Sequence, residues 1–370
     1  MYFDNVDVDE ITNYLLSSNQ DEAVYLILLA SEDMFSATSL IDLFNMKGMT
    51  FAGGIFPYVI DQGEVRDQGV IIKRYPGKGK SFVIEGGQNG QKEMDPLIDY
   101  VKKNNPQTAF IMIDGLSEDL SAYLSEMYRY LGTSVKYFGA GAGTSDLVQK
   151  PVLLSEKGLI EDGMAVMFSD CAAGISVKHG WRPFKGPLLV TETEKNRVKS
   201  LNWRNAFEVY KEQLSEKTGP VSRENFRDKS NGFPLGLYRE DSEMVIRTPI
   251  MVNQNDELVC MGNVDDNTLI YIMDGDENSL CMAAAEATRE SLKQAVKARE
   301  LLIFESISRY RFLGKNIAKE LQATKKEFLK YPDSNDVSGA LSLGNVASLP
   351  SGYLEFFSKS ILTGVFDEEC

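Results

Sequence analysis

Several residue patterns that define large protein classes are missing from this sequence. Histidine occurs once, as His179, which excludes any metal site built from two histidines. None of the four cysteines has a CxxC or other metal-ligand spacing. We therefore expect no bound metal.

Long apolar runs and a basic leader are also absent. The longest uninterrupted apolar run is Ala23 to Ala30, far shorter than the roughly 18 residues that a membrane-spanning helix needs. Asp4, Asp7 and Asp9 stand where a secretory signal would carry Lys or Arg. We expect a cytoplasmic protein that does not insert into a membrane.

Basic residues are outnumbered, with 39 Lys and Arg against 54 Asp and Glu and a net charge of −15. Nucleic acids and anionic lipids bind through clustered Lys and Arg, so neither is an expected partner. The hydrophobic content of 43% is that of a globular chain with a sizeable core.

A strand–helix–strand pattern occurs twice in the first half of the chain. Residues 23–30 and 109–113 are apolar and predict buried strands, each followed by Ser-Glu-Asp, at Ser31 and Ser117, and then by a helix with one apolar face. Each copy continues into an aromatic residue and a glycine-rich turn. The sequence predicts an internal duplication in which Gly53 and Gly141 lie at equivalent turns.

A looser third copy begins with the apolar strand at 301–304 and continues into a helix over about 314–330. Strands alternating with helices, some joined by hairpins, predict a mixed α/β fold with helices packed on mixed sheets. We predict an N-terminal segment at 1–20 and two domains at 21–232 and 233–370, with a surface connection over 217–232.

Three segments resemble cofactor motifs and fail. The stretch Gly139-Ala-Gly-Ala-Gly-Thr144 lacks the third glycine of a dinucleotide fingerprint, and Arg74 to Ser81 lacks the first glycine of a P-loop. Asp274 to Ala285 lacks the glycine and glutamate of an EF-hand. We therefore expect no cofactor. Gly53, Gly54 and Gly141 are candidates for backbone contact with a ligand, and the alternative is that they form tight turns.

The densest candidate site is His179-Gly-Trp181-Arg182-Pro183. A ring, an indole and a guanidinium in five residues could bind a carboxylate or an aromatic ligand. The alternative is that His179 and Trp181 fill an interface while Arg182 forms an internal ion pair.

The same stretch resembles the signature of the FIST family of sensory domains. Further similarities are Phe51-Ala-Gly-Gly-Ile55, Val190-Thr191 with Leu201 to Tyr210, and Pro234-Leu-Gly236 with Val245-Ile-Arg247. The chain departs from the family pattern at Ser306-Ile-Ser-Arg309, Gly344-Asn-Val346 and Phe357 to Ser360.

The resemblance implies a sensor that binds a small ligand, such as an amino acid or another small carboxylate. With no room left for a fused output domain, it implies signalling through a partner protein in trans. The ligand-binding residues we predict are Gly53, Gly54, Gly141, His179, Trp181, Arg182, Arg247 and Arg309.

Two alternatives from other functional classes stay open. The first is a hydrolase or transferase that uses His179 as base, with Ser176, Ser306 or a cysteine as nucleophile. The second is a haem-based gas sensor, because some family members bind haem, with His179 as axial ligand. We expect neither catalysis nor haem.

Overall fold

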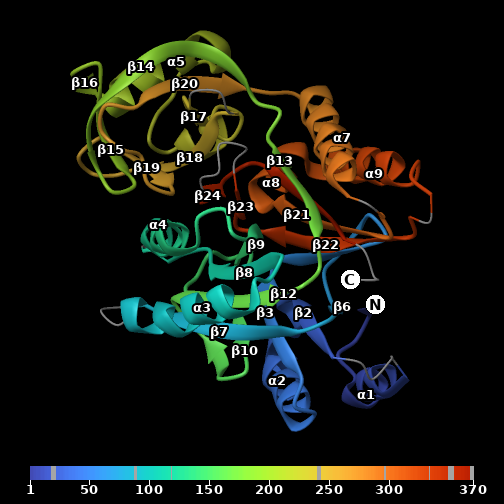
Figure 1. Ribbon diagram of the computed structural model, residues 1–370. Coiled ribbons are helices and arrows are strands. Elements are labelled where there is room, and N and C mark those ends of the chain that lie inside the picture. Colours follow the sequence, from blue (N-terminus) through green and yellow to red (C-terminus); the bar gives the residue numbers. More distant parts are fainter. Residues whose placement is uncertain are drawn as a thin grey trace.

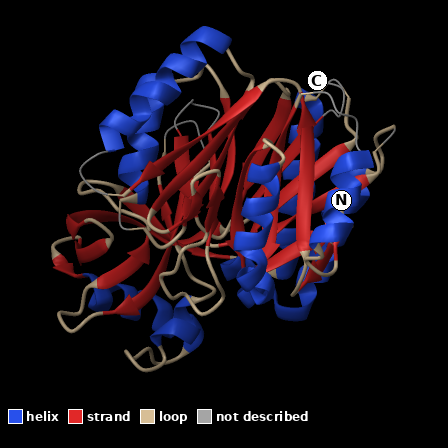
Figure 2. Ribbon diagram, turned by 90° about the horizontal axis from the view of Figure 1, so that it is seen from below, coloured by secondary structure: helices blue, strands red, loops and turns tan. Residues whose placement is uncertain are grey.

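The computed structural model describes residues 1–17, 22–86, 90–117, 119–239, 243–295, 297–332, 334–348 and 354–366. Helices and strands are both abundant and form several mixed sheets packed with helices, which confirms the predicted fold class (Figure 1). Figure 2 shows helices on the outer faces of the strand layers.

Three units repeat one order of elements. The first contains β1 (Tyr2–Phe3), α1 (Val8–Ser17), β2 (Ala23–Ala30), a 3-10 turn (Ser31–Ser36), α2 (Ala37–Met46), β3 (Thr50–Phe56), β4 (Tyr58–Asp61), β5 (Glu64–Arg66) and β6 (Val70–Pro76). The second contains β7 (Gly79–Glu85), α3 (Gly90–Asn104), β8 (Thr108–Asp114), α4 (Leu120–Leu131), β9 (Lys136–Ala142), β10 (Leu153–Ser155), β11 (Gly158–Ile160) and β12 (Gly163–Ser169). The third contains β13 (Ala173–Lys178), α7 (Glu277–Gln294), β21 (Glu300–Ser306), α8 (Ile307–Leu313), α9 (Ile317–Phe328), β22 (Asp336–Ser342), β23 (Asn345–Ser348), β24 (Leu354–Phe357) and β25 (Ile361–Phe366).

Each unit builds one six-stranded sheet of the same layout. The orders are β1-β6-β2-β3-β10-β11, β7-β12-β8-β9-β23-β24 and β13-β25-β21-β22-β4-β5. In every sheet the central pair is parallel, and the last two strands are a hairpin that belongs to a different unit. The units therefore exchange hairpins in a cycle. This layout confirms the predicted duplication and makes the looser third copy a full structural equivalent.

The predicted pairing of glycines was wrong. Gly53 and Gly54 lie within β3 and Gly141 lies within β9, so none of the three is in a turn. By strand register the equivalents are Gly53, Gly139 and Gly339, each opposite an isoleucine of the parallel neighbour. A Cβ atom there would lie 2.3, 2.1 or 1.9 Å from that isoleucine's carbonyl oxygen, so the close approach of two strands requires glycine.

The third unit is interrupted by a separate β-structure between β13 and α7. It contains β14 (Arg182–Glu194), β15 (Arg197–Leu201), β16 (Arg204–Asn205), α5 (Ala206–Thr218), α6 (Phe226–Ser230), β17 (Leu235–Leu237), β18 (Val245–Val252), β19 (Leu258–Met261) and β20 (Leu269–Asp274). The order β14-β20-β17-β18-β19-β15 returns to β14 through a further pairing. We call this closed ring, residues 182–274, the barrel; it lies at the top left of Figure 1.

Buried apolar side chains explain these elements. Every residue of β8 and β21 is buried, as expected for strands covered on both faces. On α9 the buried side chains include Ile317, Leu321 and Phe328, the predicted inner face. Glu118 of the second Ser-Glu-Asp lies outside the described residues. Among the described residues no helix is long and apolar enough to span a membrane.

Candidate functional site

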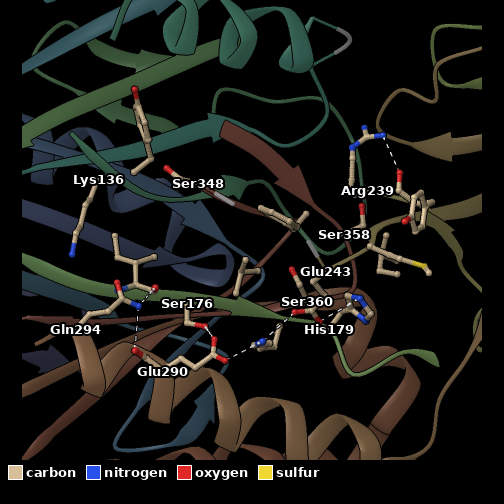
Figure 3. A pocket seen from close by; sticks show the side chains of 18 residues that line it. Lys136, Ser176, His179, Arg239, Glu243, Glu290, Gln294, Ser348, Ser358 and Ser360 are labelled. Carbon is tan, nitrogen blue, oxygen red and sulfur yellow. Dashed lines mark hydrogen bonds and ion pairs between the residues drawn. The ribbon is translucent and has the colours of Figure 1, made fainter. Parts of the chain in front are cut away.

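A cavity of about 810 Å³ lies between the barrel and the three-unit body (Figure 3). The body contributes residues from β9, β13, α7, the end of β23 and the segment leading to β25. The barrel contributes residues between β17 and β18 and one residue within β18. The described lining residues are Lys136, Tyr137, Ile175, Ser176, Val177, Lys178, His179, Tyr238, Arg239, Glu243, Met244, Ile246, Glu290, Gln294, Ser348, Phe357, Ser358 and Ser360.

His179 lies in the cavity wall with a fixed hydrogen-bond polarity. Its Nδ1 accepts the main-chain N–H of Trp181 at 2.9 Å, so in the neutral ring the proton is on Nε2. Burial, followed by the charges of Arg309 and Lys178, lowers the pKa of His179 to about 3. The ring is therefore neutral at physiological pH. Among the described residues Nε2 has no hydrogen-bond partner.

This tautomer bears on both alternative functions. A general base or an axial metal ligand needs a free lone pair on the ring, but Nδ1 uses its pair for Trp181 and Nε2 carries the proton. The proposed nucleophiles are engaged elsewhere: the Ser176 hydroxyl donates to Glu290 Oε2 at 2.9 Å, and the Ser306 hydroxyl pairs with that of Ser308. The geometry supports neither a His179 base nor a haem ligand.

The cysteines offer no better nucleophile. Cys260 is a buried free thiol whose pKa burial raises to about 12, and burial raises the pKa of the Cys281 thiol to about 11. Cys171 is disulfide-bonded and therefore offers no thiol. Cys370 lies outside the described residues.

Acidic groups surround Lys178 next to His179. The Lys178 ammonium lies 3.5 Å from Glu243, 3.2 Å from Glu290 and 3.8 Å from Glu286. Burial alone would lower the pKa of Lys178, but these carboxylates raise it. Burial raises the pKa of Glu243, against the main-chain N–H of His179 and the Lys178 charge, which lower it. Three carboxylates to one ammonium leave this side of the cavity negative.

Cations occupy the other sides. Lys136 donates to the carbonyl oxygen of Ala173 at 2.5 Å, and burial lowers its pKa. Among the described residues no carboxylate forms an ion pair with Lys136. Arg239 forms a long ion pair with Glu355, with 4.0 Å between its Nη2 and Glu355 Oε2. In Figure 3 Lys136 and Arg239 lie on opposite sides of the cavity. The cavity therefore presents both signs of charge along with apolar walls.

The segment between β24 and β25 supplies serine hydroxyls. Ser358 Oγ is buried and has no hydrogen-bond partner among the described residues. Ser360 Oγ instead accepts from Asn345 Nδ2 at 3.0 Å, in a buried group with Ser342. A buried hydroxyl without a partner costs free energy unless a ligand or water satisfies it.

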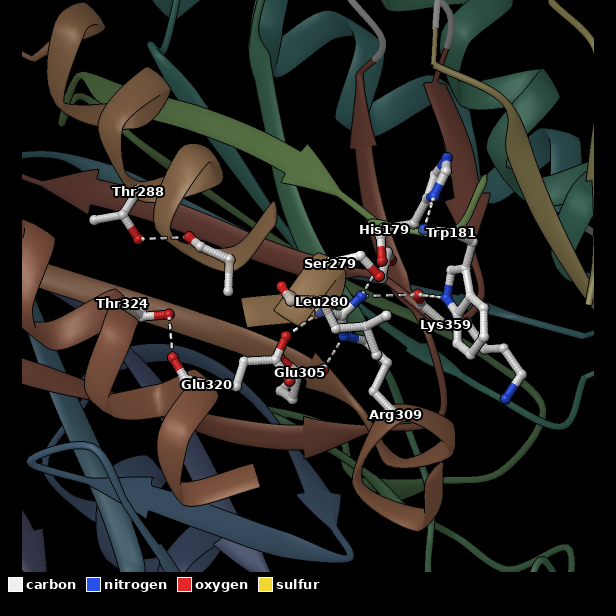
Figure 4. A network of polar contacts seen from close by, with 12 residues as sticks. His179, Trp181, Ser279, Leu280, Thr288, Glu305, Arg309, Glu320, Thr324 and Lys359 are labelled. Atoms are coloured by element: carbon white, nitrogen blue, oxygen red, sulfur yellow. Dashed lines mark hydrogen bonds and ion pairs between the residues drawn. The ribbon is translucent and has the colours of Figure 1, made fainter. Parts of the chain in front are cut away.

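A buried ionic network stands directly behind this wall (Figure 4). Arg309 is fully buried; its Nε lies 2.8 Å from Glu305, and its other nitrogens contact Glu320 and donate to the carbonyl oxygen of His179. It also donates to the carbonyl oxygen of Lys359 at 3.3 Å, which accepts Trp181 Nε1 as well, at 3.0 Å. The network holds the backbone of His179.

The structure brings only part of the predicted set to the cavity. His179 lines it, Trp181 and Arg309 lie behind it, and Arg182 lines an adjacent surface hollow of about 390 Å³. Arg247 is buried and bound to Glu355 and to main-chain oxygens. The described lining residues do not include Gly53, Gly54 or Gly141. Their part in ligand binding stays a prediction.

The sequence analysis missed the charged residues that share the cavity with His179. Lys178 directly precedes it, but Lys136, Arg239 with Glu243, and Glu290 come from three other places in the chain. Each looks like an ordinary solvated charge in its own segment. Only the fold brings them together, so no local signal could have identified them.

Two family models match the chain. The FIST N domain matches residues 25–204 and the FIST C domain matches residues 206–348. No curated protein matches. A solved structure of PurLQS from Thermotoga maritima is 10% identical, with a TM-score of 0.18, over 94% of this chain and 65% of that chain. That likeness is too low to inform fold or function. The two matches, which together cover nearly the whole chain, show that it belongs to the FIST family of sensory, signal-transduction domains.

Proposed function

We propose that this protein is a sensor that binds a small ligand in the 810 Å³ cavity and releases it unchanged. The observation that carries the proposal is the pair of buried polar atoms at the cavity wall, His179 Nε2 and Ser358 Oγ, that have no partner among the described residues. The volume falls within the range of small-molecule sites, and apolar walls with a few polar groups are typical of such sites.

The charges favour a ligand of amino-acid type or another small carboxylate. Lys136 offers an ammonium with no ion pair among the described residues, and the Glu243 side of the cavity offers an excess of carboxylates. A molecule that carries a carboxylate and an N–H group could satisfy both. Tyr137, Val177 and Ile246 supply apolar contact between these poles.

We infer that the signal passes to a partner protein in the cytoplasm, and the barrel offers a contact point. Asn202 and Trp203 join β15 to β16 in a two-residue turn with φ of 50° and 60°. Such type I′ turns favour glycine at the second position, yet the chain has a tryptophan that is 80% exposed. Its main-chain N–H donates to Thr191 Oγ1 at 3.0 Å, which fixes the backbone of the turn. An exposed indole on a fixed backbone is a typical anchor for a protein partner. With a net charge of −15, that partner is not nucleic acid.

The test is to release small molecules from the purified protein by denaturation and identify them by mass spectrometry. Ile175→Trp places an indole in the cavity, and Ile160→Trp makes the same change on a partly buried strand residue outside it. We expect one compound in stoichiometric amount from the wild type and from Ile160→Trp, and much less from Ile175→Trp. Equal amounts from both variants would show that the ligand binds elsewhere.

A further inference from the structure

His179 and Glu243 together form a paired donor and acceptor at the cavity wall. His179 Nε2 lies 3.3 Å from Glu243 Oε1, and the alignment is too poor for a hydrogen bond between them. Both residues line the cavity and the adjacent hollow. His179 Nε2 is buried without a hydrogen-bond partner, and Oε1 of the half-buried Glu243 lies beside it, so a group of matching polarity can be supplied from the cavity.

The polarity of each atom is fixed by its other contacts. Nε2 is a donor because Nδ1 accepts from Trp181. Oε1 is an acceptor because it already accepts the main-chain N–H of His179 at 3.0 Å, so any proton on this carboxyl would sit on Oε2, the atom nearer Lys178. The remaining charges around the pair are Glu286 and Glu290 beside Lys178, and Arg309 behind the ring.

An N–H donor beside an oxygen acceptor is complementary to an amide edge with its C=O and N–H on the same side. We propose that the ligand presents such an edge, a primary carboxamide or a lactam, with its oxygen on His179 Nε2 and its N–H on Glu243 Oε1. This inference rests on the proposed function, since it assigns the chemistry of one end of the same ligand.

The pair discriminates against close analogues. A carboxylate would place an oxygen against Glu243 Oε1, and an ammonium would place an N–H against Nε2–H. An ordinary trans peptide group points its C=O and N–H in opposite directions and reaches only one of the two atoms. Losing a hydrogen bond to a charged partner and leaving it buried costs about 1.5–3 kcal/mol, which corresponds to roughly 10- to 100-fold in affinity.

The test compares matched ligand pairs by thermal shift and calorimetry on the full chain. The pairs are glutamine with glutamate, asparagine with aspartate, and pyroglutamate with proline. We expect the amide member of at least one pair to bind about 10-fold or more tightly than its partner. Glu243→Met removes the acceptor oxygen, so the preference should fall towards one. Glu286→Met, beside Lys178 but outside the lining of the cavity, should keep it.

This comparison would overturn the amide edge in three ways: acids that bind as tightly as their amides, a preference unchanged in Glu243→Met, or no binding of any amide at about 10 mM, where a Kd corresponds to about −2.7 kcal/mol. If Glu243→Met does not fold, the wild-type preference alone decides. Release of a native ligand without an amide edge would refute this inference and leave the cavity as the binding site, so the two failures are distinguishable.

Discussion

Replacing Arg309 by Met should lower the free energy of unfolding by an amount that depends on pH. The guanidinium is fully buried with Glu305 and Glu320, and it donates to three main-chain carbonyl oxygens, of His179, Leu280 and Lys359. Removing one member of a buried ionic group costs about 3–5 kcal/mol, because the remaining charges lose their compensation. We expect a loss of this size in urea unfolding at pH 8.

The loss should shrink in acid. Burial, followed by the charge of Glu320, already raises the pKa of Glu305 well above its usual range. Without Arg309 the two carboxyls must hold at least one more proton in the folded state than they do beside it, whereas in the unfolded state both are ionised above about pH 4.3. The folded state then binds more protons, so stability falls as pH rises, by about 1.4 kcal/mol per unit for one proton.

The assay is the free energy of unfolding between pH 5 and 8 for wild type, Arg309→Met and the control Arg311→Met. Arg311 is on the same helix but exposed, donating to the carbonyl oxygen of Ser145. A loss of unfolding free energy below about 1 kcal/mol would be too small for a buried ionic group and would refute the reasoning. A loss that does not change with pH would refute it as well. If the variant instead stayed stable and lost ligand binding, Arg309 would be the ligand-binding residue predicted from the sequence.

Three further predictions concern single residues. The pKa of buried His179 is about 3, so below pH 6.5 only the unfolded state takes up a proton on this ring. Wild-type stability should therefore fall by about 1.4 kcal/mol per pH unit towards pH 4. In acid unfolding curves His179→Gln should lack this component. Gly139→Ala puts a methyl group 2.1 Å from the carbonyl oxygen of Ile111 and should lower the free energy of unfolding in urea by about 1–3 kcal/mol or more. Gly141→Ala, whose added methyl group has its nearest neighbour at 3.2 Å, should lower it less. Equal losses in the two variants would contradict the strand register. Trp203→Gly relieves a strained turn, so the melting temperature of the variant should not fall below that of the wild type. A partner protein identified by pull-down with the wild type should no longer bind the variant. A clear fall in melting temperature would instead give Trp203 a structural role.

Local patterns predicted the repeated strands and helices but not their connections. The strand at 23–30 and the inner face of α9 follow from apolar periodicity, which a single segment displays. The hairpin exchanges pair short strands far apart in the chain, such as β4 with β22, and no local pattern reports a partner. The surface connection predicted over 217–232 was wrong in part, because Val221 and Phe226 are buried in the core and Phe226 anchors α6 there.

The same distinction applies to the site. His179 and Trp181 were found because they stand close together in sequence, and their contact is local. Glu243 contacts His179 from 64 positions away, and Lys136 reaches the cavity from another unit. Their side chains are of the commonest surface types, so only their burial and spacing mark them as functional candidates.

The cyclic exchange of hairpins sets the order in which the chain can fold during synthesis. The first sheet has all its strands once residue 160 is available, because β10 and β11 close its edge. The second must wait for β23 and β24, and the third for β25 at 361–366. Until then both keep unpaired strand edges, which favour aggregation. The nascent chain therefore carries two unfinished sheets until residues 345–366 are available, and the strand edge at β9 stays open for the synthesis of about 200 further residues.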